Sequence, residues 1–276
     1  MTAPVERLDP SNPSERKNDS TSDELAPERI ELPLPGEVVL RPTPARALDA
    51  LVGDLLAQAM SCVRTFGDFH VALGGDTSIE TLFIRLMSDP DLRAFPWDRT
   101  HVWTTHQRSN PGEGHPNMCL LMEEFFVTHA DLPKSQAHTM TTVRPDADER
   151  YERQLAQAMS GRSRGQDRLD AVVVLIESDG GAGGVALVDE QNQTQPTSDR
   201  LCLWRSEGNA QTPTLLTLSR RFLNAARMVA IVGLGADQQG VVAEAMTHRD
   251  RLTLAPVAGE LRWYLDHAAA GVADEP

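Results

Sequence analysis

Apolar residues along the chain occur in two patterns, short continuous runs and positions four residues apart. Residues 38–40 form the first run, and residues 44–64 then carry an apolar residue at every fourth position, which predicts a strand followed by a helix. A second run at residues 69–73 ends at a pair of glycines, and an apolar helical face follows as far as Pro90. This region is therefore predicted to fold as strand, glycine turn and helix.

The same alternation continues to the end of the chain. Residues 169–176 give the clearest strand, because they are apolar from Ala171 onward, as expected at the centre of a sheet covered on both faces. Further strands are predicted at 100–104, 201–205, 215–218 and 228–232, and further helices at 118–129, 220–226, 238–246 and 259–270. This order predicts an α/β fold with an open, mostly parallel sheet, helices on both faces and right-handed crossovers.

The start of the chain has a different composition. Residues 1–36 combine six prolines with Ser, Asp, Glu and Asn, and such a segment buries too little apolar surface to offset its chain entropy. We therefore expect a disordered acidic tail at 1–36 and a single α/β domain at 37–272.

Charge and cysteine content narrow the function classes. The chain has 26 basic and 40 acidic residues, and its net charge of -14 argues against a nucleic-acid partner. Its three cysteines are isolated, which fits a reducing compartment. No apolar run reaches the roughly 20 residues of a membrane span, and no signal-peptide pattern opens the chain. We expect a cytoplasmic protein without membrane contact; the histidines lack metal-ligand spacing, so neither a metal nor a cofactor is expected.

Four segments, in order, resemble motifs of the 6-phosphogluconolactonase family and of its relatives, the glucosamine-6-phosphate deaminases. They read VALGGDTS from Val71, HVWTTHQRSNP from His101, AVVVLIESDGG from Ala171 and FLNAARMVAIVGLG from Phe222. The later segment GELRWYLDHAAA resembles the family's terminal helix. The resemblance spans about residues 40–270. It implies a modified Rossmann-like fold and a role in carbohydrate metabolism, within the pentose phosphate pathway.

The glycine turn corresponds to the family's phosphate site. Backbone N–H groups in such a turn, together with the N-terminus of the next helix, favour a bound anion. The resemblance assigns this role to Gly74, Gly75 and Thr77. Asp76 stands where the family has serine, and its carboxylate is expected to turn away and cap the helix. The alternative is a structural turn without a ligand.

Two more positions correspond to ligand-binding residues of the family. Arg108 matches an arginine whose planar fork binds phosphate or carboxylate. Asn117 matches an asparagine, and it either bonds a sugar hydroxyl or caps the following helix. Gln238 occupies the place of a lysine that neutralises phosphate in the family. Three arginines nearby in sequence are candidates to replace that charge: Arg220, Arg221 and Arg227.

The catalytic motif departs from the family pattern. In lactonases of this family the histidine of an Asp-Gly-His motif activates water, and Gly181 stands at that position here. Loss of a general base lowers a rate by about two to four orders of magnitude. The candidate replacements are His106, which stands in place of an acidic residue, and Asp179. Glu177 is a further candidate, but for both Glu177 and Asp179 an exposed carboxylate with an ordinary pKa is a poor base at neutral pH. The alternative for residues 179–184 is a flexible glycine loop.

The leading hypothesis is a protein that binds 6-phosphogluconolactone or a related hexose 6-phosphate and hydrolyses the lactone with altered catalytic residues. The alternative is a catalytically inactive paralogue that senses a sugar phosphate or docks to a protein partner. A sugar-phosphate isomerase or deaminase is a third, weaker hypothesis, because that chemistry also uses the missing histidine. All three require Thr77 and Arg108 to lie at one cleft.

Overall fold

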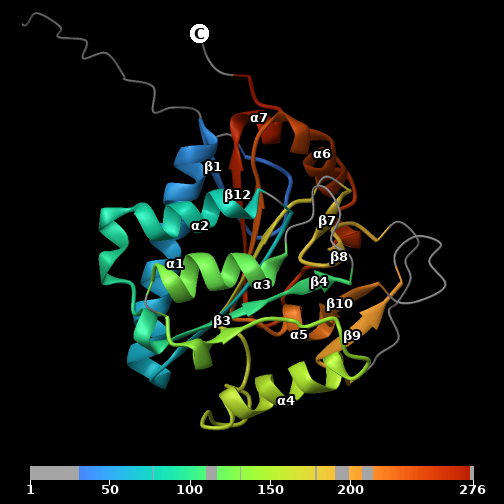
Figure 1. Cartoon of the computed structure of the whole chain (residues 1–276). Coiled ribbons are helices and arrows are strands. Elements are labelled where there is room, and N and C mark those ends of the chain that lie inside the picture. The colour runs from blue at the N-terminus through green and yellow to red at the C-terminus, as the bar shows by residue number, and fades with distance from the viewer. Residues whose placement is uncertain are drawn as a thin grey trace, which may run out of the picture. The chain divides into compact units, whose positions relative to one another are not determined.

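The fold is built around the predicted strands, as a computed structural model of the chain shows (Figure 1). The structure describes residues 31–76, 78–109, 117–130, 132–177, 179–189, 199–206 and 214–273. Most of the predicted tail, residues 1–30, lies outside this description. The last residues assigned to the tail contact the domain, because Leu34 is buried and the carbonyl of Pro35 accepts a hydrogen bond of 2.9 Å from Trp263 Nε1.

A parallel sheet of seven strands runs through the domain in the order β1-β12-β11-β6-β2-β3-β5. Its strands are β1 (Glu37–Arg41), β2 (Phe69–Gly74), β3 (Thr100–Thr104), β5 (Ala137–His138), β6 (Ala171–Leu175), β11 (Met228–Gly233) and β12 (Glu260–Asp266). Every neighbouring pair is parallel, which confirms the predicted sheet. All residues of β6 are buried and the strand lies at the centre, as predicted.

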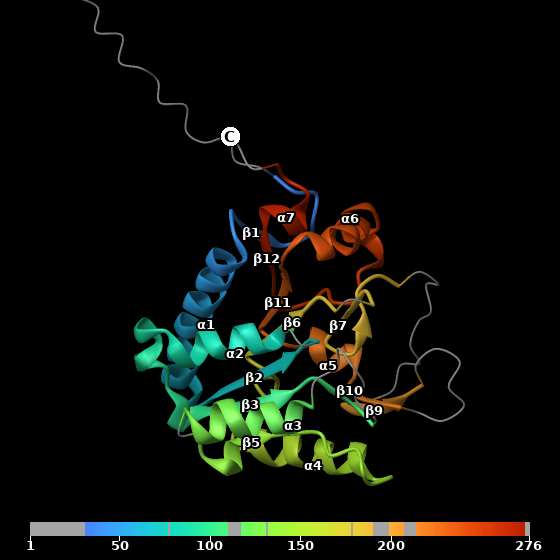
Figure 2. The same ribbon diagram turned by 45° about the horizontal axis from the view of Figure 1, so that its top comes forward.

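Helices cover both faces of this sheet (Figures 1 and 2). Successive strand residues point to opposite faces, so Val172 and Val174 pack into one core and Val173 packs into the other. The first core contains α4 (Ala147–Met159), α5 (Arg220–Asn224), α6 (Gln239–Thr247) and α7 (His267–Ala270). The second contains α1 (Pro44–Phe66), α2 (Ile79–Ser88), α3 (Met118–Leu121) and the π-helix Met122–Thr128 that continues α3.

Short turns of 3-10 helix complete the helical part of the domain. They are Pro90–Ala94, Trp97–Arg99, Lys134–Gln136, Ala236–Gln238 and Arg249–Arg251. Among the described residues, no helix combines the length and the apolarity required to cross a bilayer.

The helix predicted at 259–270 is wrong. This segment forms β12, which pairs with β1 and β11, and only its end forms the short α7. Leu261 and Leu265 are four residues apart, a spacing that fits one helical face and equally fits two strand repeats. In the structure both leucines and Trp263 face one core, whereas Tyr264 faces the other.

Two small antiparallel units lie beside the main sheet. One is a three-stranded sheet in the order β4 (His106–Arg108), β10 (Leu215–Leu218) and β9 (Cys202–Arg205). The other is a hairpin of β7 (Gly181–Ala182) and β8 (Val185–Ala186). The predicted strands at 201–205 and 215–218 therefore exist, but they belong to this second sheet.

Candidate functional site

Three neighbouring strands of the parallel sheet lead into polar or glycine-rich segments. β2 ends at Gly74, β3 continues through Thr105 into β4, and β6 leads toward Glu177 and Asp179. Because β3, β2 and β6 are parallel neighbours, these segments meet at one edge, where open α/β sheets bind ligands (Figure 1). We call the polar group at this edge the carboxyl-edge site; its members are Asp76, His106, Arg108, Glu177 and Asp179.

The glycine turn after β2 packs closely against the two other segments. A Cβ atom at Gly74 would lie 1.8 Å from Thr105 Oγ1 and 3.2 Å from the Cα atom of Gly183, so only glycine fits there. The N–H of Thr105 also donates to a carbonyl of β2. Thr77 lies outside the described residues, and the phosphate-binding role of Gly74, Gly75 and Thr77 stays a prediction.

Asp76 lies just before the helix that follows the turn. Its Oδ1 accepts a hydrogen bond of 2.9 Å from the N–H of Ser78, and its carbonyl accepts one of 3.0 Å from Ile79. The N-cap residue of α2 is Ser78, and among the described residues no side-chain hydrogen bond caps the helix, so the capping role expected for Asp76 is wrong: its carboxylate closes a local turn before the helix.

Glu177 lies at the centre of the carboxyl-edge site and is only 1% exposed. Its Oε2 is 3.5 Å from Arg108 Nη1, and its Oε1 is 3.7 Å from His106 Nε2. Arg108 also donates a hydrogen bond of 3.2 Å from Nη2 to Oδ2 of Asp179. One guanidinium therefore lies between two carboxylates, one of them buried and the other half-exposed.

The surroundings of Glu177 favour its protonated form. Burial raises the pKa of this carboxyl from 4.5 to about 7, and the nearby charges of Asp179 and Asp76 act in the same direction. Arg108 and a hydrogen bond from the backbone of Gly184 oppose the rise in pKa. The expectation of an exposed carboxylate with an ordinary pKa is therefore wrong for Glu177.

The glycine segment after β6 forms the β7–β8 hairpin and packs on the site. A Cβ atom at Gly181 would lie 2.9 Å from Asp179 Oδ1 and 3.5 Å from Cδ of Glu177. The Glu177 carboxyl thus lies beside the position where a side chain at residue 181 would begin. Gly184 has a φ of +85°, and a Cβ atom there would lie 2.6 Å from the Cβ of His106.

Asn117 has a structural role at the start of α3. Its Oδ1 accepts hydrogen bonds from the N–H groups of Cys119 and Leu120, at 3.1 and 3.4 Å. Gln107 supports the same helix, because its Oε1 accepts a 3.1 Å bond from the N–H of Met118. The capping alternative is confirmed for Asn117, and its contact with a sugar hydroxyl stays a prediction.

The three arginines considered as replacements for the family lysine have other partners. Arg220 donates to the carbonyl of Thr253 at 2.9 Å, and Arg221 pairs with an exposed carboxylate. Arg227, which directly precedes β11, donates to the buried Asp170 at 3.0 Å. Each of these guanidinium groups is thus engaged in a structural contact.

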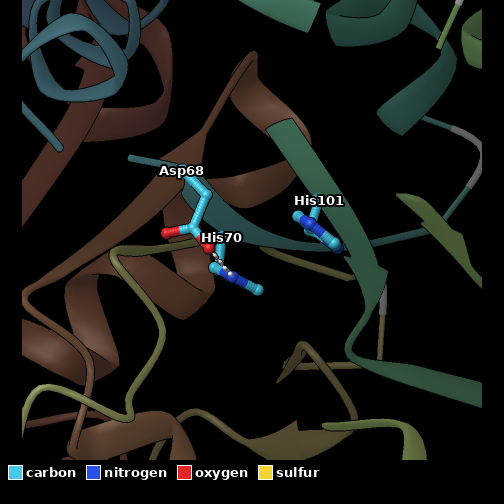
Figure 3. Close-up of side chains that lie close together, drawn as sticks. All are labelled: Asp68, His70 and His101. Atoms are coloured by element: carbon cyan, nitrogen blue, oxygen red, sulfur yellow. Dashed lines mark hydrogen bonds and ion pairs between the residues drawn. The ribbon is translucent and has the colours of Figure 1, made fainter. Parts of the chain in front are cut away.

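A second polar cluster lies at the opposite, amino-terminal edge of the sheet. Asp68, His70 and His101 bring their oxygen and nitrogen atoms within 4.8 Å of one another (Figure 3). Asp68 comes from the turn before β2, His70 from β2 and His101 from β3. Spacing along the sequence therefore does not reveal this group. Asp68 Oδ2 is 3.2 Å from His70 Nε2, and His70 Nδ1 accepts a 3.2 Å bond from Trp103 Nε1.

The geometry of this cluster fits a hydrogen-bonded network better than a metal site. The rings of His70 and His101 stack with centroids 4.4 Å apart and an angle of 12° between their planes. Ring nitrogens bind a metal in the plane of the ring, so two nearly parallel rings do not direct their lone pairs at one ion. Asp68 is also held by Arg162; hydrogen bonds from His70 and Arg162 outweigh the effect of burial and lower the pKa of Asp68 to about 2.

A cavity of about 1070 Å³ lies elsewhere in the fold. Side chains of α4 and α5, together with the loop after α4, line it, and they include Met159, Arg164 and Phe222. None of the carboxyl-edge residues belongs to its described lining. The candidate site is therefore defined by converging side chains rather than by this cavity.

Fold and site together define an open, parallel α/β domain whose candidate catalytic groups meet at the carboxyl edge of the sheet. A family model described as "Glucosamine-6-phosphate isomerases/6-phosphogluconolactonase" matches residues 42–262. The chain belongs to this family, which confirms the resemblance carried by its motifs.

The relatives of the chain are distant. A 6-phosphogluconolactonase of Nostoc sp. is 26% identical over 235 residues, which cover 82% of this chain and 91% of the relative. The GDH/6PGL endoplasmic bifunctional protein of Homo sapiens is 25% identical over 80% of this chain. This chain spans only 28% of that human protein and 29% of its Oryctolagus cuniculus counterpart.

Solved structures confirm the fold class. A 6-phosphogluconolactonase from Thermotoga maritima superposes with a TM-score of 0.65 at 18% identity, covering 83% of this chain and 99% of that one. A monomeric glucosamine-6-phosphate deaminase gives a TM-score of 0.61 at 15% identity, covering 86% of this chain and 100% of that one. At these identities the similarity concerns the fold alone.

Proposed function

We propose that the chain binds 6-phosphogluconolactone, or a related hexose 6-phosphate, at the carboxyl-edge site and hydrolyses the lactone. We also propose that this reaction belongs to the pentose phosphate pathway and takes place in the cytoplasm. Family membership supports the class of ligand. The observation that carries the proposal is the position of Arg108, whose guanidinium lies between Glu177 and Asp179 at the edge where three parallel strands end.

In this proposal the phosphate binds to the glycine turn and to Arg108. Asp179 is half-exposed and accepts one hydrogen bond from Nη2 of Arg108, so a phosphate oxygen takes its place as the partner of that nitrogen. Glu177 repels the anion less when its carboxyl is protonated. Asn117 contributes a hydrogen bond to a sugar hydroxyl. Backbone N–H groups for the phosphate come from Gly74, Gly75 and Thr77.

A specific observation favours the inactive paralogue as the second candidate. Gly181 offers no side chain for proton transfer, and within the described segments the candidate bases at the carboxyl-edge site are Glu177, Asp179 and His106. A chain that uses none of them would bind sugar phosphate without turnover, as a sensor or as a partner of another protein.

Binding and turnover separate these candidates. Calorimetry of the purified chain with 6-phosphogluconate is expected to show binding that Arg108→Ala abolishes. Arg93→Ala, in an exposed 3-10 turn outside the carboxyl-edge site, serves as the matched control and is expected to bind like the wild type. An assay with fresh lactone, corrected for spontaneous hydrolysis, then distinguishes an enzyme from a sensor. A wild-type chain that shows neither binding nor turnover contradicts the proposal.

A further inference from the structure

One atom of the carboxyl-edge site has no hydrogen bond in the part of the chain that the structure describes. Oε1 of Glu177 is fully buried and has no partner within hydrogen-bond distance there. A buried polar atom without a partner lowers stability, so each one calls for an explanation; the described residues hold three more, on Arg85, Arg168 and Gln238, all outside the carboxyl-edge site. Glu177 directly follows the last buried residues of the central strand and comes from the middle of the sheet.

The other oxygen of the same carboxyl is held in place. Arg108 lies 3.5 Å from Oε2, and the backbone of Gly184 donates a hydrogen bond to the carboxyl. Oε1 instead lies 3.7 Å from Nε2 of His106. His106 is itself fixed, because its Nδ1 lies 3.0 Å from the hydroxyl of Thr105. The two oxygens of Glu177 therefore differ, because Oε2 is anchored and Oε1 keeps an unused hydrogen-bonding capacity among the described residues.

From this geometry we infer that Glu177 is the proton-transfer residue of the site, with His106 positioning it; the inference rests on the proposed function. Oε1 accepts a proton from water while the water oxygen bonds to the carbonyl carbon of the lactone. The bond between that carbon and the ring oxygen then breaks, and the same proton passes from Glu177 to the departing oxygen. Glu177 returns to its carboxylate form, and the product is the open-chain acid.

Asp179 is less suited to this step. Its Oδ1 accepts a 2.9 Å hydrogen bond from the N–H of Gly181, its Oδ2 accepts one from Arg108, and half of its side chain is exposed. Both oxygens are thus occupied. The charged groups that act on Glu177 are Asp179 and Asp76, which raise its pKa, and Arg108, which lowers it. Burial is the largest effect and brings the pKa to about 7, where a carboxyl group accepts and returns a proton readily.

The test is Glu177→Gln, which keeps the size of the side chain and removes the proton acceptor. We expect kcat to fall by about two to four orders of magnitude, with the affinity for 6-phosphogluconate within about threefold of the wild type. The wild-type kcat/KM is expected to rise with pH through about 7, because the base acts only when deprotonated, and this rise is lost in the variant. Glu177→Asp retains a carboxyl and is expected to keep the rise with reduced kcat.

Two controls separate the inference from folding effects and from the proposed function. Glu149→Gln changes an exposed carboxyl of α4 and is expected to leave turnover unchanged. His106→Gln tests positioning, since it is expected to lower kcat while the rise with pH persists. Wild-type turnover in Glu177→Gln overturns the inference and leaves the proposed function standing. Binding by the wild type without any turnover also overturns it and favours the sensor, whereas absence of both overturns the two proposals together.

Discussion

The buried carboxyl of Glu177 is expected to make the protein less stable as pH rises. Its pKa is raised from 4.5 to about 7 in the folded chain, so the folded state holds this proton when the unfolded state has lost it. The free energy of unfolding therefore falls with increasing pH between these two values. Below about pH 4.5 both states are protonated, and above about pH 7 both are charged, so the loss is complete there.

The size of the effect follows from the two pKa values. One pKa unit corresponds to about 1.4 kcal/mol, so a rise from 4.5 to about 7 amounts to about 3 kcal/mol at neutral pH and above. Because Glu177 is 1% exposed, solvent screens this contribution little. A loss of this size is a large fraction of the stability of an ordinary domain.

Urea unfolding of Glu177→Gln and of the wild type, from about pH 5 to about pH 8, measures the effect. Glutamine does not titrate, and other titrating groups cancel in the difference between the two proteins. The difference in unfolding free energy is expected to shift in favour of the variant by about 2–3 kcal/mol over this range, because part of the loss already occurs below about pH 5. Glu149→Gln, which changes an exposed carboxyl of α4, is the matched control for the substitution itself. A difference that does not change with pH for Glu177→Gln would refute a raised pKa at this position.

Two further substitutions probe the same edge. Gly181→His should lose stability in urea, because its Cβ would lie 2.9 Å from Oδ1 of Asp179 and its imidazole would have to fit beside the Glu177 carboxyl, whereas Glu177→Gly combined with Gly181→His opens space there. The double variant is expected to exceed Glu177→Gly alone in lactone turnover by at least about tenfold, and equal rates would contradict this. Gly74→Ala should destabilise by about 1–3 kcal/mol because of its 1.8 Å approach to Thr105, while Gly53→Ala, in open space on α1, should stabilise by about 0.5–1 kcal/mol. Equal unfolding midpoints for these two alanine variants would show that the turn is not closely packed.

The central strands and first helices of the fold could be predicted because their signals are local. β6 is apolar at every position, and α1 repeats its apolar residues with a helical period. β12 was assigned wrongly since Leu261 and Leu265 fit either period, and only pairing with β1 and β11 decides between them. The prediction also omits α4, although its buried residues are spaced by four: Ala147, Tyr151, Leu155 and Met159.

The properties of the site depended on contacts distant in sequence. Arg108 and Asp179 are 71 residues apart, and their hydrogen bond forms because the segments that follow the parallel strands β3 and β6 meet at one edge of the sheet. The burial of Glu177 has the same origin, since β4 and the β7–β8 hairpin pack around it, and no local pattern distinguishes it from the half-exposed Asp179. Residue identity therefore indicated the candidate groups, and the tertiary packing determined the burial of Glu177 and its raised pKa.

The buried carboxyl groups at the two edges of the sheet differ in how completely they are hydrogen-bonded. At the amino edge, Asp170 accepts hydrogen bonds from Arg162, from Arg227 and from the N–H of His70, so both of its oxygens are satisfied and its charge supports the fold. At the carboxyl edge, Glu177 keeps an unsatisfied oxygen and a raised pKa, both of which lower stability at neutral pH. The same substitution, Glu177→Gln, is thus expected to increase stability at neutral pH and to lower kcat by about two to four orders of magnitude. If Glu177→Gln were neither more stable nor slower in turnover than the wild type, the buried carboxyl would have neither the destabilising effect nor the catalytic role inferred for it.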